Sequence, residues 1–507
     1  MRLTCAVLSV ILLPAAGFGG DTRVAEAAMR EDNAAVRTLL RQKADVNATL
    51  PDGTTALHWL VQGVVQAEDL ETVGLLIQAG ANVKVKDRYG FTPLYFAAAN
   101  GNAAVIRKLL EAGADPNAAD ASGETALMTA TRSGSADALK ALLQNGASVN
   151  AKDAVTQQTA LMWAVRSNSA ASVLLLVEYG AEINARTRIG KAPGARPPGA
   201  GGGSHGVGIV RSGWPEQGFQ PETPGGMTPL LYAARDGRAD IARILVTAKA
   251  DVQQADANGI TPLLMAITNN HLDVAQFLLQ NSANPSAADW WGRTPLYATV
   301  EIRNRDYGRN GEHDIDRPAA LELIRALLDR GANVNARTKE APPIRRFITP
   351  LGDLSWVDFT GQTAFVRAAL AGDMTLMRLL LAKGADPNIP TFAGTTALMA
   401  AAGVNWMGGQ TYTESKEALM EAVQLCLDKG GDVNAKNSMG VTAVIGAANR
   451  GSDEILEFLV KKGARLDVKD KEGRTPLAWA EGVFLATNAP EAKPSTIALI
   501  KRLTAHE

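Results

Sequence analysis

A glycine-rich stretch around one histidine is the first place in this sequence where chemistry could occur. It reads RPPGAGGGSHGVG from Arg196 to Gly208, and glycine-rich loops bind phosphates in many enzymes. A P-loop requires Lys and then Ser or Thr after its last glycine, with a strand before it and a helix after it. Here Gly206 is followed by Val207, and proline recurs on both flanks. The stretch is therefore interpreted as a flexible spacer rather than a nucleotide site.

Metal and nucleophile motifs are equally weak. Glu312, His313 and Asp314 are consecutive potential metal ligands, but a solvated loop explains such a run better. The two cysteines, Cys5 and Cys426, exclude a Cys₄ zinc site by counting, and none of the five histidines forms an H-E-x-x-H motif. No histidine lies near a recognisable nucleophile turn, so no Ser–His–Asp set can be assigned. The sequence thus predicts a non-enzymatic protein without metal or cofactor.

Bulk composition excludes further classes of protein. The chain has 507 residues, 20% of them charged, and a formal net charge of −1. Such a balance argues against a nucleic-acid partner, because non-specific nucleic-acid binding normally requires a basic surface. No apolar run reaches the roughly 18 residues of a membrane-spanning helix.

The N-terminus resembles a secretory signal. Arg2 precedes a mostly apolar run from Leu3 to Pro14, and small residues follow. We expect a signal peptide over residues 1–20, with cleavage between Gly17 and Gly20, and hence a periplasmic or secreted protein. The alternative is a buried first helix in a cytoplasmic protein.

The rest of the chain is a repeat array. Twelve in-phase units are visible when the sequence is aligned on the threonine that opens each one. Six of the eleven spacings between successive threonines equal 33 residues. The aligned positions are Thr22, Thr55, Thr92, Thr125, Thr159, Thr228, Thr261, Thr294, Thr363, Thr396, Thr442 and Thr475.

These units closely resemble the ankyrin repeat family. The motif T-P-L begins at Thr92, Thr228, Thr261, Thr294 and Thr475, and T-A-L begins at Thr55, Thr125, Thr159 and Thr396. The motif G-A-D/N-x-N begins at Gly113, Gly331 and Gly384. The resemblance implies an all-α solenoid in which each unit is a helix pair with a projecting hairpin, and it implies a protein partner on the concave side. Exported ankyrin proteins of this kind look bacterial.

Local chemistry supports the same fold. Thr can cap a helix, Pro fits its first turn, and Gly ends a helix in the left-handed conformation. The family has His after T-P-L, where it links neighbouring repeats by hydrogen bonds, but here only His58 retains it. Tyr95, Met128, Met162 and Met399 occupy this position elsewhere. Hydrogen bonding between repeats is therefore in question at those units, whereas packing is not. We expect a structural role for His58.

The array, taken as residues 21–507, leaves no block large enough for a catalytic domain. Its surplus residues are expected in insertions at about 186–226, 302–317, 338–359 and 403–415. Aromatic and basic residues are concentrated in these insertions and in one hairpin, as is typical of protein interfaces. The candidate partner-binding residues are Arg211, Trp214, Phe219, Trp290, Trp291, Arg345, Arg346, Trp356, Trp406 and Tyr412.

We therefore expect a monomeric, non-catalytic scaffold that binds a partner protein on its concave face, with the inserted hairpins as side walls. The aromatic residues could instead hold their own loops in place. A second hypothesis is a small-molecule or carbohydrate pocket closed by the aromatic loops. A third is an enzyme that uses Glu312, His313 or Asp314.

Overall fold

The structure is a computed structural model, and seven stretches of the chain are described. Their boundaries are 21–63, 67–190, 225–304, 316–339, 360–406, 413–483 and 491–505. Within them the chain forms 24 α-helices and no β-strand, which confirms the predicted all-α fold of twelve helix pairs. The hairpins between pairs are turns, three of which carry an isolated bridge: Ala119–Thr125, Lys152–Thr159 and Ile189–Gly225.

The chain divides into two compact units, residues 1–181 and 182–507. The helices of unit 1 are α1 (Arg23–Met29), α2 (Asn33–Arg41), α3 (Ala56–Gln62), α4 (Ala67–Gln78), α5 (Pro93–Ala99), α6 (Ala103–Glu111), α7 (Ala126–Ser133), α8 (Ala136–Gln144), α9 (Ala160–Arg166) and α10 (Ala170–Glu178).

The helices of unit 2 follow the same plan. They are α11 (Pro229–Arg235), α12 (Ala239–Thr247), α13 (Pro262–Thr268), α14 (Leu272–Gln280), α15 (Pro295–Arg303), α16 (Arg317–Asp329), α17 (Ala364–Ala371), α18 (Met374–Ala382), α19 (Ala397–Ala402), α20 (Lys416–Asp428), α21 (Ala443–Arg450), α22 (Asp453–Lys461), α23 (Pro476–Glu481) and α24 (Pro494–Thr504).

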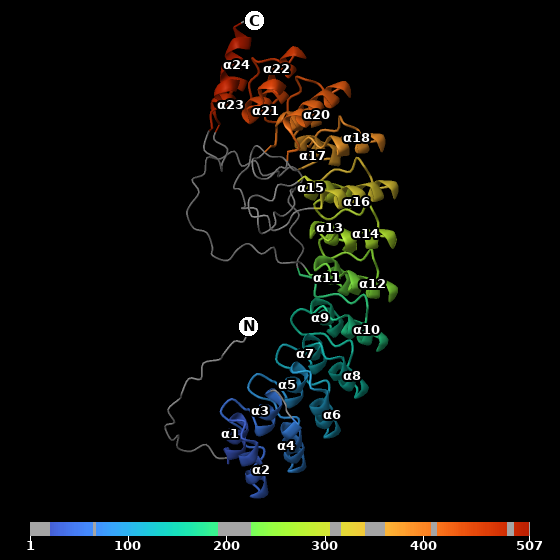
Figure 1. Cartoon of the computed structure of the whole chain (residues 1–507), viewed down its shortest axis with the longest axis vertical. Helices are drawn as coiled ribbons and strands as arrows, with labels where there is room; N and C mark the ends of the chain where they lie inside the picture. Colours follow the sequence, from blue (N-terminus) through green and yellow to red (C-terminus); the bar gives the residue numbers. More distant parts are fainter. Residues whose placement is uncertain are drawn as a thin grey trace. The chain divides into compact units, whose positions relative to one another are not determined.

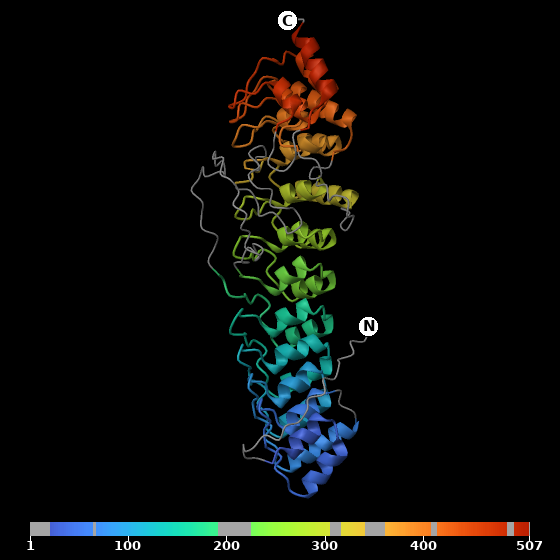
Figure 2. The same ribbon diagram turned by 90° about the vertical axis from the view of Figure 1, so that its left-hand side faces the viewer.

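In each unit the odd-numbered "first helices" form one layer and the even-numbered "second helices" form another (Figure 1). The turns that precede the first helices, here called fingers, project to one side of both layers (Figure 2). Every one of the twelve aligned threonines lies at the N-cap of a first helix. Thr92, for example, accepts a hydrogen bond from the backbone of Tyr95 through its hydroxyl.

The core lies between the two layers. First helices are short and rich in alanine, so they pack closely; Ala97 and Ala98 of α5 are fully buried. Second helices are amphipathic and bury a stripe at helical spacing, such as Val105, Ile106 and Leu109 of α6. A helix pair cannot cover this apolar surface alone, so successive pairs must stack.

The fingers are joined by backbone hydrogen bonds from one repeat to the next. In unit 1 the amide of Arg88 donates to the carbonyl of Asp52 over 2.9 Å, and Ala154 donates to Ser122 over 2.8 Å. In unit 2 Trp290 donates to Asn258 over 2.8 Å. Each finger thereby satisfies polar groups of its neighbour and fixes the spacing between repeats.

A side-chain amide at the end of the G-A-D/N-x-N motif bridges the other edge of neighbouring repeats. Asn117 donates from Nδ2 to the carbonyl of Gly146 over 3.0 Å and accepts at Oδ1 from the amide of Ser148 over 2.7 Å. The same double bridge recurs at Asn47, Gln253, Asn335 and Asn434. In the example of Asn117 the bridge satisfies the carbonyl of the glycine that follows the second helix of the next repeat.

The position that holds histidine in the family also supplies hydrogen bonds between repeats where tyrosine replaces the histidine. The hydroxyl of Tyr95 hydrogen-bonds to Glu124 over 3.3 Å, and that of Tyr297 hydrogen-bonds to Gln362 over 2.9 Å. Both acceptors belong to the following repeat. Hydrogen bonding between repeats is thus retained at these tyrosines. At the other edge it passes through side-chain amides at most junctions, whereas Lys84 and Ser286 occupy the amide position in two repeats.

Replacing Asn117 by alanine is expected to lower the free energy of unfolding by about 1–2 kcal/mol, because two hydrogen bonds between repeats are lost at a partly hydrated site. The exposed Gln144 of α8 is a matched control, and its replacement by alanine should cost less than about 0.5 kcal/mol. Chemical denaturation of the two variants checks this expectation. Equal losses would show that the bridge adds no stability.

Unit 2 contains a buried ionic cluster beside the end of α15. Nε of Arg303 lies 2.8 Å from Oδ2 of Asp373, and both side chains are almost completely buried. Arg317 lies 3.8 Å from the same carboxylate and also pairs with Glu414. The guanidinium of Arg367 donates to the carbonyl of Asn304 over 3.0 Å. The cluster thus links three segments of the chain: the end of α15, the start of α16 and the residues just before α20.

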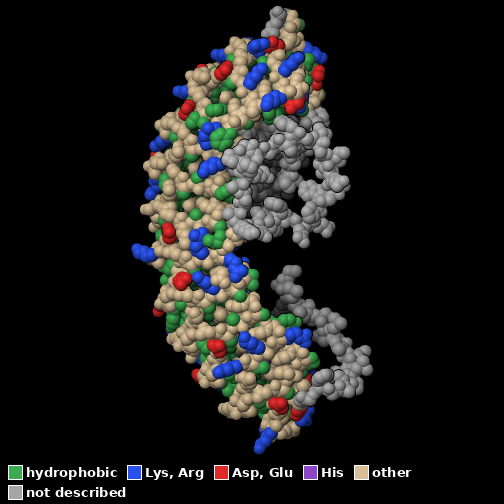
Figure 3. All heavy atoms as spheres, turned by 180° about the vertical axis from the view of Figure 1, so that it is seen from behind, with side chains coloured by type: hydrophobic (Ala, Val, Ile, Leu, Met, Phe, Trp, Pro, Cys, Tyr) green, Lys and Arg blue, Asp and Glu red, His purple; other side chains and the backbone are tan. Residues whose placement is uncertain are grey.

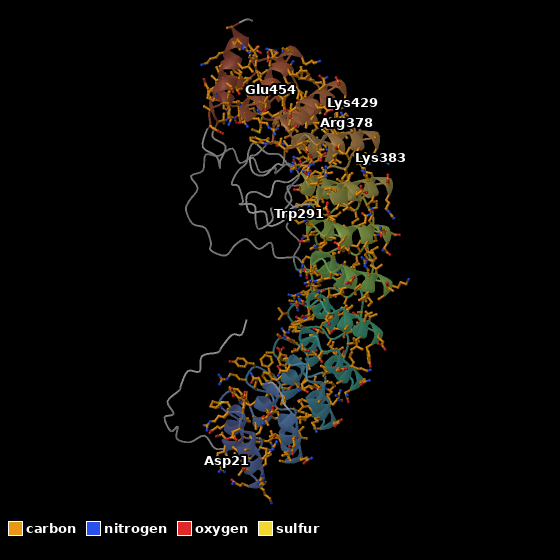
Figure 4. All side chains as sticks on the ribbon, viewed as in Figure 1. Asp21, Trp291, Arg378, Lys383, Lys429 and Glu454 are labelled. Atoms are coloured by element: carbon orange, nitrogen blue, oxygen red, sulfur yellow. The ribbon has the colours of Figure 1, made fainter. Side chains whose placement is uncertain are left out.

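The Arg303→Met variant is expected to lose about 3–5 kcal/mol of stability, because it leaves the buried carboxylate of Asp373 without its nearest cation. The exposed pair Arg378–Glu421 on the second-helix side (Figure 4) provides the control. The Arg378→Met variant should lose at most about 1 kcal/mol. Thermal melts of both variants at one pH distinguish the sites, and a similar shift in both would contradict the assignment.

Candidate binding surface

Three of the ten candidate residues lie within the described part of the chain: Trp290, Trp291 and Trp406. The other seven lie outside the described residues. They are Arg211, Trp214, Phe219, Arg345, Arg346, Trp356 and Tyr412.

Trp290 and Trp291 form the finger before α15. Their rings meet edge to face with centroids 5.6 Å apart, and the guanidinium of Arg293 lies 5.5 Å from the ring centre of Trp291. The carbonyl of Trp291 accepts a hydrogen bond from the amide of Lys339 in the next finger. Trp291 lies on the first-helix side of unit 2 (Figure 4). Both rings are half-buried, so they stabilise the finger and still expose part of their surface.

Trp406 lies directly after α19, two repeats further along unit 2. The guanidinium of Arg450 lies 5.0 Å from its ring centre and donates to the hydroxyl of Thr413 over 2.9 Å. Burial lowers the pKa of Arg450 to about 10, so this side chain remains charged at neutral pH. Trp406 therefore packs against the half-buried guanidinium of Arg450, two repeats away from the Trp290–Trp291 finger.

A different set of aromatic residues gathers in unit 1, at the fourth position after the aligned threonine. Trp59, Phe96 and Trp163 occupy this position on α3, α5 and α9, and all three are half-buried. We call them the aromatic row. At the same position in unit 2, Tyr232 and Trp479 are buried. The partly exposed row is thus a property of unit 1.

Further rings extend the aromatic row towards a fingertip. Phe91 and Tyr95 stack with centroids 4.4 Å apart, and Phe96 meets the ring of Phe91 edge to face at 5.8 Å. Tyr89, at the fingertip, lies 6.3 Å from Phe91 and is 61% exposed. Such offset and edge-to-face contacts hold rings in place while leaving their outer surfaces available.

Arg132 connects three repeats on this surface. It lies at the end of α7, and its guanidinium lies 4.6 Å from the ring centre of Trp163 in the next repeat. It also forms a 2.5 Å ion pair with Glu124 and lies 3.5 Å from the hydroxyl of Tyr95 in the preceding repeat. A planar cation held over an indole is pre-organised for contact with a partner, because little side-chain entropy remains to be lost.

The face drawn in Figure 3 shows basic and acidic side chains interspersed over both units, and its hydrophobic side chains form only small patches. Within the described residues no group of three potential metal ligands occurs, and no helix there is long and apolar enough to cross a membrane. Two clefts, of about 150 and 380 Å³, have no aromatic side chain in their linings. His313 and its neighbours lie outside the described residues.

Comparison of the sequence with known protein families agrees with the observed array of helix pairs. A sequence model for three copies of the ankyrin repeat matches residues 24–120, 112–187, 216–289 and 414–482. A model for the single ankyrin repeat matches residues 291–339 and 360–392. Together these matches cover well over half of the chain.

The chain belongs to the ankyrin repeat family.

Short vertebrate proteins are among its curated relatives. The Notch-regulated ankyrin repeat-containing protein of Xenopus tropicalis is 34% identical over 89 residues, which are 17% of this chain and 75% of that protein. The human protein of the same name is 33% identical over the same shares. Protein A of that name from Danio rerio is 31% identical over 77 residues, 15% of this chain and 65% of its own length. These similarities concern the repeats and give no support for a bacterial or exported protein.

The aromatic row was not among the sequence-predicted residues, although a signal for it exists. Once ankyrin units are aligned on their threonines, the fourth following position reads Trp59, Phe96, Thr129 and Trp163 in four consecutive repeats. The candidate binding residues predicted from the sequence lie in the expected insertions and in one finger, where aromatic content is most conspicuous. Exposure of a ring on a regular helix depends on neighbouring repeats, which a single unit does not reveal.

His58 has the structural role expected of the ankyrin histidine. Its Nδ1 accepts the amide hydrogen of Thr55 over 3.1 Å, and its Nε2 lies 3.2 Å from the carbonyl of Phe91 in the next repeat. The side chain is fully buried. Burial outweighs the opposing hydrogen bond to Phe91 and lowers the pKa of His58, so the imidazole of the folded protein is neutral at pH 7.

This lowered pKa predicts a loss of stability in mild acid. The unfolded chain takes up a proton near pH 6.5, whereas folded His58 does so only at lower pH. Its contribution is therefore complete above about pH 6.5 and is lost as the pH falls towards the folded value. The fall in melting temperature between pH 7.5 and 5.5 should be smaller in the His58→Gln variant than in the wild type. The same fall in both proteins would contradict the prediction.

Proposed function

We propose that this ankyrin array is a non-catalytic scaffold that binds a partner protein through the first-helix and finger surface of unit 1. Ankyrin repeats generally mediate protein–protein interaction. The observation that supports this particular surface is the partly exposed aromatic row, which continues through Tyr95 and Phe91 to the exposed Tyr89. Trp, Tyr and Arg are the residues most enriched among the energetic centres of protein interfaces.

The proposal includes a secondary role for the inserted segments. Trp290 and Trp291 lie on the first-helix side of unit 2, and the inserted hairpins are proposed as side walls for a bound partner. Export through the apolar N-terminus also remains a proposal. N-terminal sequencing of the mature protein tests it, because an uncut Met1 would contradict a cleaved signal.

Site-specific photo-crosslinking tests the binding surface directly. A photoreactive phenylalanine analogue at Tyr89 in the full-length chain is expected to give a discrete adduct with a protein partner in extracts of the native source. The same analogue at Leu174, which is 53% exposed on the second helix α10, is the matched control. Equal yields of the same adduct from both positions would place the partner elsewhere.

A point variant measures the energetic contribution of the row. Trp163→Ala is expected to weaken binding of the crosslinked partner at least about tenfold, or about 1.4 kcal/mol, because the ring and the stacked Arg132 are lost together. Leu174→Ala should leave the affinity unchanged. Circular dichroism melts of both variants separate lost binding from lost folding, and an unchanged affinity of folded Trp163→Ala would contradict the proposal.

A further inference from the structure

On the proposed binding surface the cationic side chains are exposed, whereas the carboxylates are buried or half-buried. The surface comprises the fingers and first helices of residues 49–63, 84–100, 117–133 and 150–167. Its cations are all exposed: Lys84, Lys86, Arg88, Arg132, Lys152 and Arg166. Its carboxylates are all buried or half-buried: Asp52, Asp87, Asp120, Glu124 and Asp153. The formal charges nearly cancel, but the outward-facing ones are positive.

The carboxylates are turned inward because the fingers use them as hydrogen-bond acceptors. Asp120 accepts from the amides of Ser122 and Glu124, each over 2.8 Å. Asp153 accepts from the amides of Val155 and Gln158 over 2.9 and 2.7 Å. Burial opposes the ionisation of Asp153, but its hydrogen bonds outweigh burial and lower its pKa. These charges are thus retained, and the finger backbone satisfies them.

The cations hold their charge at the surface. Arg132 and Arg166 occupy the seventh position after the aligned threonine in adjacent repeats. In the sequence, Arg132 precedes Trp163 and Arg166 follows it. Lys86 and Arg88 lie on a finger and donate to the backbone carbonyls of Ala119 and Pro51. A carbonyl partner adds no negative charge of its own, whereas Arg132 shares its charge with Glu124. An approaching molecule therefore meets positive charge around exposed rings, which favours an anionic partner.

We infer that this surface binds an acidic protein segment that carries aromatic or aliphatic anchor side chains. The inference rests on the proposed function and specifies the chemistry of its partner. Packed helices lie about 8–10 Å apart, so three repeat steps from Trp59 to Trp163 span about 30 Å. An extended segment rises about 3.3 Å per residue, and about nine residues cover that distance. Apolar side chains would contact the rings while carboxylates pair with the flanking cations.

Nucleic acid is the other anion that combines stacking surfaces with negative charge. It is less favoured here, because its binding draws on a dense basic stripe, and the six exposed cations stand among inward carboxylates of nearly equal number. A single-stranded oligonucleotide is nevertheless included as a probe, so that the measurement can decide between the two.

Fluorescence anisotropy with the full-length chain tests the inference. The probes are three fluorescein-labelled twelve-residue peptides with the same leucine and phenylalanine positions and with glutamate, lysine or serine at the others, and a labelled twenty-nucleotide oligo-dT. The glutamate peptide is expected to bind at least tenfold more tightly than the lysine peptide. Its affinity should fall as NaCl rises from 50 to 500 mM.

Charge-removing variants locate the effect. The double variant Arg132→Gln/Arg166→Gln is expected to weaken binding of the glutamate peptide at least fivefold. The double variant Lys84→Gln/Arg166→Gln retains the Arg132–Trp163 stack and should weaken binding of the glutamate peptide at least threefold. Because the stack is intact in this variant, its weaker binding cannot be attributed to a folding defect at Trp163. Arg107→Gln/Lys140→Gln removes the same charge from exposed positions on the second helices α6 and α8, and it should leave binding unchanged.

Several outcomes would overturn the inference. Equal or tighter binding of the lysine peptide, tighter binding of oligo-dT, or binding of none of the peptides would each exclude an acidic segment as the partner. Persistent crosslinking at Tyr89 would then show that the proposed function survives and only the partner chemistry is wrong. Equal crosslinking from positions 89 and 174 would instead reject the surface itself.

Discussion

A side-chain amide that ends the G-A-D/N-x-N motif is the interaction that recurs along one edge of this array and joins neighbouring repeats. The amide of Asn117 donates to the carbonyl of Gly146, the glycine just beyond the second helix of the next repeat, and accepts a backbone hydrogen from Ser148 in return. One side chain thus satisfies a helix end and sets the distance to its neighbour. Because the apolar stripe of a helix pair is covered only by adjacent pairs, every buried contact relies on this spacing.

Buried charge performs a corresponding task in unit 2, where residues 304–316 separate α15 from α16. One ionic cluster joins α15, α16 and the turns before α18 and α20. Its members are Arg303, Arg317, Asp373 and Glu414. An ion pair in the interior is costly to desolvate, and removing one of its partners is strongly destabilising because a buried charge is then left unpaired.

Rigidity and binding are linked on the proposed surface of unit 1. The carboxylates that accept backbone hydrogens within the fingers are turned away from solvent, so the same residues that stiffen the fingers leave the cations to define the outward charge. Arg132 contributes both to rigidity and to the proposed binding surface, since it forms an ion pair with Glu124 and lies over the ring of Trp163. A partner would meet side chains that are already in position, which reduces the entropy cost of binding.

The sequence by itself determined the helix pairs and their phase, because the threonine caps, the glycine stops and the apolar stripes are local signals that recur every 33 residues. It also singled out Trp290, Trp291 and Trp406 as candidate binding residues, but it did not reveal the contacts that surround them. Trp163 and Trp479 show what only the tertiary structure decided. Both occupy the fourth position after a cap, yet Trp163 is half-exposed beneath Arg132, whereas Trp479 is buried and donates to Asp470. Exposure depends on what adjacent segments bring to the ring, and no single repeat contains that information.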